Sequence, residues 1–217
     1  MRAAKRAEGA EAYIPPDAAL AQLKGAVQSC RGCDLYLHAT QAVFGEGPAL
    51  ARIVMVGEQP GDKEDLAGHP FVGPAGALLN RAMEDAGIDR SDVYVTNAVK
   101  HFKFEPRGKR RIHKKPSDTE IAACKPWLWA ELQRTRPEVI VCLGATAARS
   151  VIGKEHHLLQ RRGQFFPHST GASVTATVHP SSILRAPDET RRHAGYAAFV
   201  QDLRAVRAKL STVARAH

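Results

Sequence analysis

Three loops of this sequence combine residue types that could bind or react with a ligand. The first reads GEQPGDKED from Gly57 and HPFVGPAG from His69. Its glycines and prolines let the backbone pass close to a ligand, so that N–H and C=O groups can bind it directly. Phe71 is either a core side chain or a flat surface on which a ring can stack. The four acidic side chains offer acid–base chemistry or a partner that orients a histidine, with a solvated loop as the simple alternative.

The other two loops each begin where an apolar run ends. Asn97 precedes the second loop, and its side-chain amide can both donate to and accept from one edge of a nucleobase, although an Asx turn is a common alternative. The third loop, residues 179–185, holds a histidine, a proline turn, two hydroxyls and an arginine. Helix-start N–H groups and the hydroxyls of Ser181 and Ser182 suit phosphate, whereas His179 can meet developing negative charge.

The cysteines indicate metal or redox chemistry rather than a disulfide scaffold. Four cysteines in 217 residues are too few for such a scaffold, and Cys30 and Cys33 form a C-x-x-C pair that is compatible with zinc, iron–sulfur or redox use. Cys124 is the natural third member of this group. Cys142 lies inside an apolar run and is interpreted as a small buried hydrophobe.

The charge of the chain favours a polyanionic partner. Lysine and arginine number 31 against 22 acidic residues, a net charge of +9. Most of the excess lies between Lys100 and Lys115, where eight basic residues face the single acid Glu105. A basic loop with glycine and proline is a plausible contact for a nucleic-acid backbone, and a solvated basic loop is the alternative.

Apolar runs and capping residues predict the elements that position these loops. Strands are expected at residues 52–57, 92–96, 139–144, 163–166 and 173–178. Helices are expected from an Asp17 cap, from Gly73-Pro74 to Gly87, from the Ser117 and Glu120 capping box to about residue 134, over 145–152 and from about Asp188. Strands that alternate with helices favour a parallel sheet covered on both faces, with the ligand at the carboxyl ends of its strands.

The chain length suits one ordinary domain. Residues 1–16 are small, charged and end in two prolines, which predicts a flexible basic tail ahead of a single domain over 17–217. No apolar run is long enough to cross a bilayer, and the first residues lack the apolar core of a secretory signal. We therefore expect a cytoplasmic protein that works at the nucleoid, is not secreted, contacts no membrane and is a monomer.

Together the loops resemble the uracil-DNA glycosylase superfamily, and its iron–sulfur family 4 branch in particular. The motifs GE-x-PG, F-V-G-P-A-G, T-N-x-V-K and H-P-S-S occur in that order in the stretch from Cys30 to about Arg185. GEQPG from Gly57 and KRRIH from Lys109 resemble the UdgX group, whose members couple covalently to uracil-containing DNA, whereas ordinary family 4 members lack the inserted KRRIH segment. The resemblance implies an α/β fold, a three-layer α/β/α sandwich with a central, mostly parallel four-stranded sheet.

The resemblance also implies a role for each matching residue. Uracil would be bound by Gly57, the backbone at Gln59, Phe71 as a stacking ring and Asn97. The catalytic set would be His113 as nucleophile, His179 at uracil O2, and Glu58 or Asp62 as the carboxylate that assists His113. The predicted DNA contacts are Lys100, Lys109, Arg110, Arg111, Ser181, Ser182 and Arg185, of which Arg185 is expected to act as a wedge in duplex DNA.

A 4Fe-4S cluster is the implied cofactor. Its ligands would be Cys30, Cys33, Cys124 and His101, since family 4 has a cysteine directly after T-N-x-V-K and this chain has His101 there, as the UdgX group does. Its expected role is structural, to pin the N-terminal segment to the basic loop.

Three functions stay open at this point. The favoured one is a single-turnover glycosylase that recognises uracil in DNA, cleaves the N-glycosidic bond and becomes linked to C1′ through His113. The second is a conventional multi-turnover uracil-DNA glycosylase of base excision repair, in which His113 only contacts phosphate. The third is a non-catalytic nucleic-acid-binding or zinc-binding module. Free DNA as a product would separate the first two, and binding that ignores uracil would favour the third.

Overall fold

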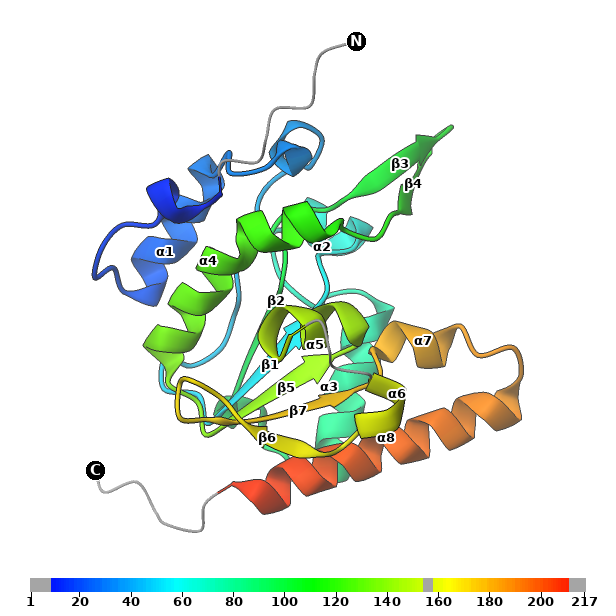
Figure 1. The fold of residues 1–217 in the computed structure, drawn as a ribbon. Coiled ribbons are helices and arrows are strands. Elements are labelled where there is room, and N and C mark those ends of the chain that lie inside the picture. Colours follow the sequence, from blue (N-terminus) through cyan, green and yellow to red (C-terminus); the bar gives the residue numbers. More distant parts are fainter. Residues whose placement is uncertain (1–8, 154–157, 211–217) are drawn as a thin grey trace.

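A five-stranded sheet forms the centre of the molecule in the computed structural model, which describes residues 9–153 and 158–210 (Figure 1). The strands are β1 (Ile53–Gly57), β2 (Val93–Asn97), β5 (Val139–Leu143), β6 (Phe165–Pro167) and β7 (Ser173–Thr177), in the spatial order β2-β1-β5-β7-β6. Neighbouring strands are parallel except β6, which runs antiparallel to β7. The predicted α/β class is therefore confirmed. The sheet has five strands and not the predicted four, because β6 adds a strand at one edge.

Alternate side chains of the central strands enter two separate cores. On one face Met55 and Val141 pack with α3 (Pro74–Ala86) and α8 (Glu189–Lys209). On the other face Val54, Ile140 and their neighbours pack with α4 (Asp118–Thr135) and α5 (Ala145–Val151). Strands that are buried on both faces consist mostly of consecutive apolar residues, and for this reason they can be predicted from the sequence.

The remaining helices are short and lie near the loops. They are α1 (Leu20–Ala26), α2 (Asp62–Ala67), α6 (Leu158–Arg161) and α7 (Pro180–Leu184), with 3-10 turns at Glu11–Tyr13, Val27–Ser29, Asp34–Leu37 and Arg90–Asp92. The predicted capping box of Ser117 and Glu120 is confirmed, as is the left-handed Gly87 after α3. Among the described residues, no helix is both long enough and apolar enough to span a membrane.

The basic segment after β2 is predicted to be a loop, but it forms a β-hairpin. β3 (Phe104–Arg107) pairs antiparallel with β4 (Arg110–His113) through a two-residue turn. Gly108 occupies the turn with φ of +57°, a conformation that suits glycine in a tight hairpin. The register sets His113 opposite Phe104 at the base of an arm that projects from the body of the molecule (Figure 1). The hairpin therefore carries its basic tip outward and keeps His113 near the sheet.

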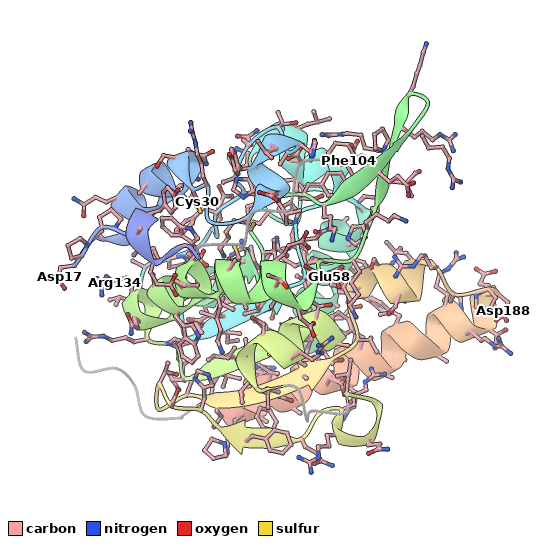
Figure 2. The ribbon with its side chains drawn as sticks, turned by 45° about the horizontal axis from the view of Figure 1, so that its top comes forward. Asp17, Cys30, Glu58, Phe104, Arg134 and Asp188 are labelled. Atoms are coloured by element: carbon pink, nitrogen blue, oxygen red, sulfur yellow. The ribbon has the colours of Figure 1, made fainter. Side chains whose placement is uncertain are left out.

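Residues 9–16 are ordered, contrary to the predicted flexible tail; residues 1–8 lie outside the described part. Ala10 is fully buried in a third apolar cluster, together with Cys30, Cys33 and Trp127, because the chain folds back over the cysteine pair. Asp17 does not cap α1, which begins at Leu20. It adopts φ of +54° instead and lies beside Arg134, as Figure 2 shows, with 4.0 Å between Oδ1 and the guanidinium.

Candidate active site

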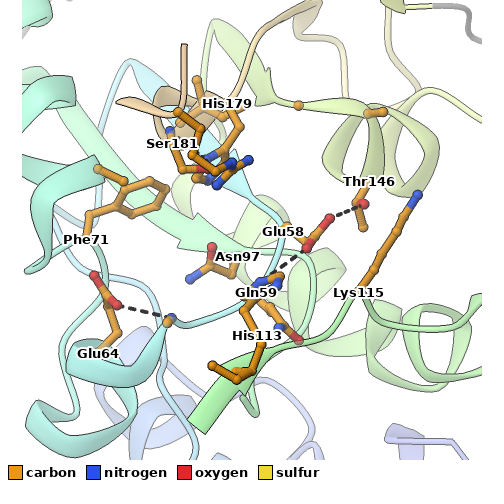
Figure 3. A pocket seen from close by; sticks show the side chains of 17 residues that line it. Glu58, Gln59, Glu64, Phe71, Asn97, His113, Lys115, Thr146, His179 and Ser181 are labelled. Carbon is orange, nitrogen blue, oxygen red and sulfur yellow. Dashed lines mark hydrogen bonds and ion pairs between the residues drawn. The ribbon is translucent and has the colours of Figure 1, made fainter. Parts of the chain in front are cut away.

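A cavity of about 610 Å³ opens at the carboxyl ends of β1, β2, β5 and β7 (Figure 3). This is the place that a parallel sheet predicts for a ligand. The residues that line it are Glu58, Gln59, Gly61, Glu64, Phe71, Ala75, Asn97, Ile112, His113, Lys115, Leu143, Gly144, Ala145, Thr146, His179, Ser181 and Arg185. All three predicted loops therefore meet at one site.

One wall of the cavity has the groups that suit a flat heterocycle. Asn97 ends β2 and is almost fully buried, and its side chain lies in the cavity between Phe71 and His113 (Figure 3). Gly57 makes this approach possible, because a Cβ there would lie 2.3 Å from Asn97 Oδ1 and 2.8 Å from the Phe71 ring. Phe71 has φ of +57° and its ring lies nearly parallel to that of His179, at 6.2 Å between centroids. The predicted grouping of Gly57, Phe71 and Asn97 is thus present.

His179 is held as a neutral hydrogen-bond donor. It caps α7, and its Nδ1 accepts from the backbone N–H of Ser181 at 3.2 Å and lies 2.8 Å from the Ser181 hydroxyl. Burial, with smaller effects of Arg185 and His113, lowers the pKa of His179 to about 4. The ring is therefore uncharged at neutral pH, and because Nδ1 is an acceptor, the proton resides on Nε2.

His113 lies across the cavity beside a carboxylate. Its Nε2 is 3.4 Å from Glu58 Oε1, and Glu58 Oε2 accepts a hydrogen bond from the Thr146 hydroxyl (Figure 3). Partial burial lowers the pKa of His113 below its usual range; Glu58 opposes this effect and Arg185 adds to it. At neutral pH the imidazole therefore carries a free ring-nitrogen lone pair, which a nucleophile needs.

Two clamps fix the base of the hairpin that carries His113. The Gln59 side chain donates to the carbonyl groups of Lys103 and Lys114, at 3.1 and 3.0 Å, and accepts from the Lys103 N–H at 3.1 Å. The Arg111 guanidinium donates to Asp62 and Asp65 at 2.5 Å each. The rings of Phe102 and Phe104 face the same guanidinium.

The second clamp corrects two predictions. Asp62 is not among the residues that line the cavity, because Arg111 holds its carboxylate outside. Arg111 in turn is engaged by two carboxylates, so it is not a free cation for DNA. Glu58 is the carboxylate beside His113.

The predicted DNA contacts are distributed unevenly. Lys100 is wrong as a DNA contact because its side chain is fully buried against Glu131. Lys109 and Arg110 are exposed at the hairpin tip, away from the cavity lining. Ser181 and Arg185 line the cavity, and the exposed Ser182 donates its hydroxyl to the His179 carbonyl. The exposed residues Lys109, Arg110, Ser182 and Arg185 therefore stay candidates for contact with DNA. The Ser181 hydroxyl is shared with His179 Nδ1.

Three of the four predicted metal ligands, Cys30, Cys33 and Cys124, belong to the third apolar cluster, and Figure 2 shows Cys30 apart from Glu58. Cys30, Cys33 and Cys124 are buried, as is His101, whose pKa burial lowers to about 4. Cys30 accepts from the Trp127 indole N–H and Cys124 from the Lys100 backbone N–H, both at 3.2 Å. Within the described ranges, no three His, Cys, Asp or Glu side chains converge as the ligands of a single metal ion do. Buried sulfurs that accept N–H groups suit a thiolate-bound cluster, whose protein ligands spread over several irons.

Three of the side chains that shape the site were not predicted from the sequence. Thr146 bonds to Glu58, and no motif marks it. Glu64 accepts from the N–H groups of Gly61 and Gly73, at 3.1 and 2.8 Å, and so ties the two halves of the first loop together. Its spacing of three residues after Gly61 is that of a capping box and could have indicated this role. The clamp by the Gln59 side chain has no signal in the sequence because its partners are backbone groups.

Comparisons with known proteins agree with this arrangement. Residues 44–204 match the family model of the uracil DNA glycosylase superfamily. The chain is 42% identical over 160 residues to a type-4 uracil-DNA glycosylase of Thermotoga maritima, covering 73% of this chain and 80% of that protein. It is 38% identical over 168 residues to the type-4 enzyme of Archaeoglobus fulgidus, covering 74% and 81%. A type-5 uracil-DNA glycosylase of Pyrobaculum aerophilum is 29% identical over 157 residues, covering 63% and 64%. With the cavity at the carboxyl ends of its parallel strands and more than half of its length within the family model, this chain belongs to the uracil-DNA glycosylase superfamily.

Proposed function

We propose that this protein removes uracil from DNA by cleaving the N-glycosidic bond and then stays linked to C1′ of the sugar through His113, as in the UdgX group. The activity of its type-4 relatives supports the first part. One observation carries the second: a neutral imidazole with a carboxylate 3.4 Å from its Nε2 lies in the same cavity as His179. The base would enter against Phe71 and pair with the Asn97 amide and the backbone at Gln59.

The reaction needs two groups on opposite sides of the sugar–base bond. As the C1′–N1 bond breaks, its electron pair leaves with uracil, and the Nε2–H of His179 stabilises the negative charge at O2. A His113 ring nitrogen gives its lone pair to C1′ and forms the new N–C1′ bond. The resulting imidazolium is stabilised by Glu58 until its ring proton passes to solvent. An N-alkyl imidazole does not hydrolyse readily, so each molecule reacts once.

The clamps explain why an imidazole can compete with water. A nucleophile held at a fixed place gains a large effective concentration over a free reactant. Gln59 fixes the backbone on both sides of the hairpin base, next to His113, and Arg111 fixes the strand that carries it. The exposed Lys109 and Arg110 and the rim residue Arg185 would contact the DNA backbone or hold the duplex open.

A 4Fe-4S cluster is the cofactor that the buried cysteines fit. Cys30, Cys33, Cys124 and His101 would hold it, and when bound it would cross-link the N-terminal segment to α4 and to the root of the hairpin. His101 lies within electrostatic reach of Asp65, and Asp65 binds Arg111. These contacts connect His101, a proposed cluster ligand, to Arg111, which holds the strand that carries His113.

A denaturing gel tests the proposed function. The protein is mixed with a labelled uracil oligonucleotide, boiled in SDS and compared with a thymine oligonucleotide of the same sequence. We expect a retarded band with uracil alone, whose amount does not exceed that of the protein. Abasic sites in molar excess over protein, without a retarded band, would instead indicate a multi-turnover glycosylase. Binding of both oligonucleotides without either product would indicate a binding module.

The role of Glu58 predicts a shift in the pH profile. The nucleophile acts when neutral, so the rate of adduct formation should rise with pH and level off above the pKa of His113, below pH 6.5. Glu58 raises that pKa, so Glu58→Gln should move the midpoint to lower pH. The plateau should fall about 10-fold because the imidazolium loses its carboxylate. Single-turnover gel assays from pH 4.5 to 8 measure both effects, and a midpoint that moves upward would refute this role.

A further inference from the structure

A fully buried ion pair lies behind the cavity, and the proposed chemistry does not use it. The Lys100 ammonium binds the Glu131 carboxylate, and the side chains of both residues are 0% exposed. Lys100 follows β2 by three residues, whereas Glu131 belongs to α4. The ring of Phe44 covers the ammonium at 5.7 Å. The pair therefore joins the end of β2 to the helix that carries Cys124.

Every polar atom of the pair has a partner. Lys100 Nζ has three donors, and they go to Glu131 Oε2, to Thr96 Oγ1 at 2.7 Å and to the Asn97 carbonyl oxygen at 2.8 Å. Glu131 Oε1 accepts from the Gly45 N–H, the Tyr94 hydroxyl and the Thr96 hydroxyl, at 2.9, 3.0 and 2.9 Å. Two of the three Lys100 bonds thus end on the last two residues of β2.

Stability alone is a weak reason for such an arrangement. Removing two charges from water is so costly that well-packed apolar residues often serve a fold as well as, or better than, a buried ion pair. A satisfied buried network does, however, fix its members in one geometry. Here the fixed groups are the Asn97 carbonyl and the Thr96 hydroxyl, at the end of β2. The backbone beyond Asn97 stays bonded to the neighbouring chain, since Ala98 and Val99 donate their N–H groups to the carbonyls of Gly57 and Glu58.

We infer that Lys100 and Glu131 are positioning residues for uracil recognition, acting through the backbone of Asn97. The ammonium anchors the Asn97 carbonyl from behind, so the side-chain amide meets the base edge in one orientation, next to Gly57. Asn97 has little freedom on the cavity side, where a single Cβ at Gly57 would overlap its Oδ1. Without the bond from Lys100, the peptide plane that carries the Asn97 carbonyl could tilt, which would turn the amide away from the base. This inference rests on the proposed removal of uracil.

The test separates positioning from stability. Lys100→Met keeps the length of the side chain, removes all three donors and leaves Glu131 unpaired, so it should lower both the thermal midpoint and the rate of uracil release. Lys100→Met/Glu131→Leu removes both charges and should regain most of the thermal midpoint. Its single-turnover rate should stay about 10- to 100-fold below wild type, because a misplacement of about 1 Å in a site has that effect. Lys24→Met, which breaks an exposed ion pair with Glu46, is the matched control.

Binding supplies the second measurement. Affinity for a thymine oligonucleotide, which does not use the base edge, should be unchanged in every folded variant. A double variant that regains both stability and rate would overturn the inference, since the pair would then be structural only. If the double variant does not fold, Thr96→Val supplies the test. This substitution removes one acceptor of Lys100 and keeps the volume of the side chain. An unchanged rate of uracil release in the folded Thr96→Val protein would overturn the inference. If wild type releases no uracil, the proposed function fails first, and this inference with it.

Discussion

His113→Ala is expected to abolish the retarded band while leaving slow release of uracil. The methyl group cannot attack C1′, but Asn97, Phe71 and His179 remain in place to bind the base and stabilise it as it leaves. Water can enter the space of the lost imidazole and hydrolyse the sugar cation. The gel assay and a count of abasic sites per protein molecule measure the two outcomes, and the count should exceed one with time.

The control for this variant is His193→Ala, which removes an exposed histidine of α8 that does not line the cavity. It should form the adduct at the wild-type rate. An SDS-stable band that persists in His113→Ala would show that another side chain captures the sugar. Peptide mapping of that band would then identify the true nucleophile.

His179→Ala is expected to slow uracil release about 100- to 1,000-fold, the usual effect of removing one donor from a developing oxyanion. His179→Gln keeps a side-chain donor and should regain part of this loss. The adduct should slow to the same extent, since His113 can attack only as the base leaves. Rapid-quench single-turnover assays measure both steps.

The pH dependence gives a separate check on His179. The pKa of His179, about 4, leaves the ring neutral from pH 5 to 9. Any change of rate that wild type shows in this range should therefore also be present in His179→Gln. A midpoint near pH 6.5 that is lost in the variant would mean that the charged imidazolium is the active form. The neutral-donor role would then be wrong.

The architecture was predictable wherever burial is two-sided. Every residue of β1, β2 and β5 is buried, so β1 and β5 are apolar runs and β2 begins with one, Val93 to Val95. Parallel strands also gather the loops that follow them at one edge of the sheet. Asn97, His179 and Glu58 could be assigned to one site for this reason alone. Caps at Ser117 and Gly87 are local signals and were equally readable.

The hairpin was not predictable because it lacks a buried face. β3 and β4 are mostly exposed, so no alternation of apolar and polar residues marks them, and Pro106 argues against a strand except at an edge. Its conformation depends on the turn at Gly108 and on contacts of its base with Gln59, Asp62 and Asp65.

Charge alone likewise does not show which basic residues face solvent. Lys100 and Arg111 look like members of one basic run, yet their partners Glu131 and Asp65 are 31 and 46 residues away in the sequence. A lysine in a buried ion pair and a lysine that faces solvent cannot be told apart in the sequence. Only the tertiary contacts separate Lys100 from Lys109.

The ordered N-terminal segment acts as a cover over Cys30 and Cys33. Gly9 donates its N–H to the Gly32 carbonyl at 3.2 Å, and a Cβ at Gly32 would lie 2.5 Å from the Gly9 carbonyl oxygen, so the two backbones touch directly over the cysteine turn. Ala10 is fully buried in the third apolar cluster, together with both cysteines. A chain shortened to begin at Asp17 would retain all cavity residues yet open the two sulfurs to oxygen and chelators. Residues 9–16 would therefore govern how long the proposed iron–sulfur cluster survives in air.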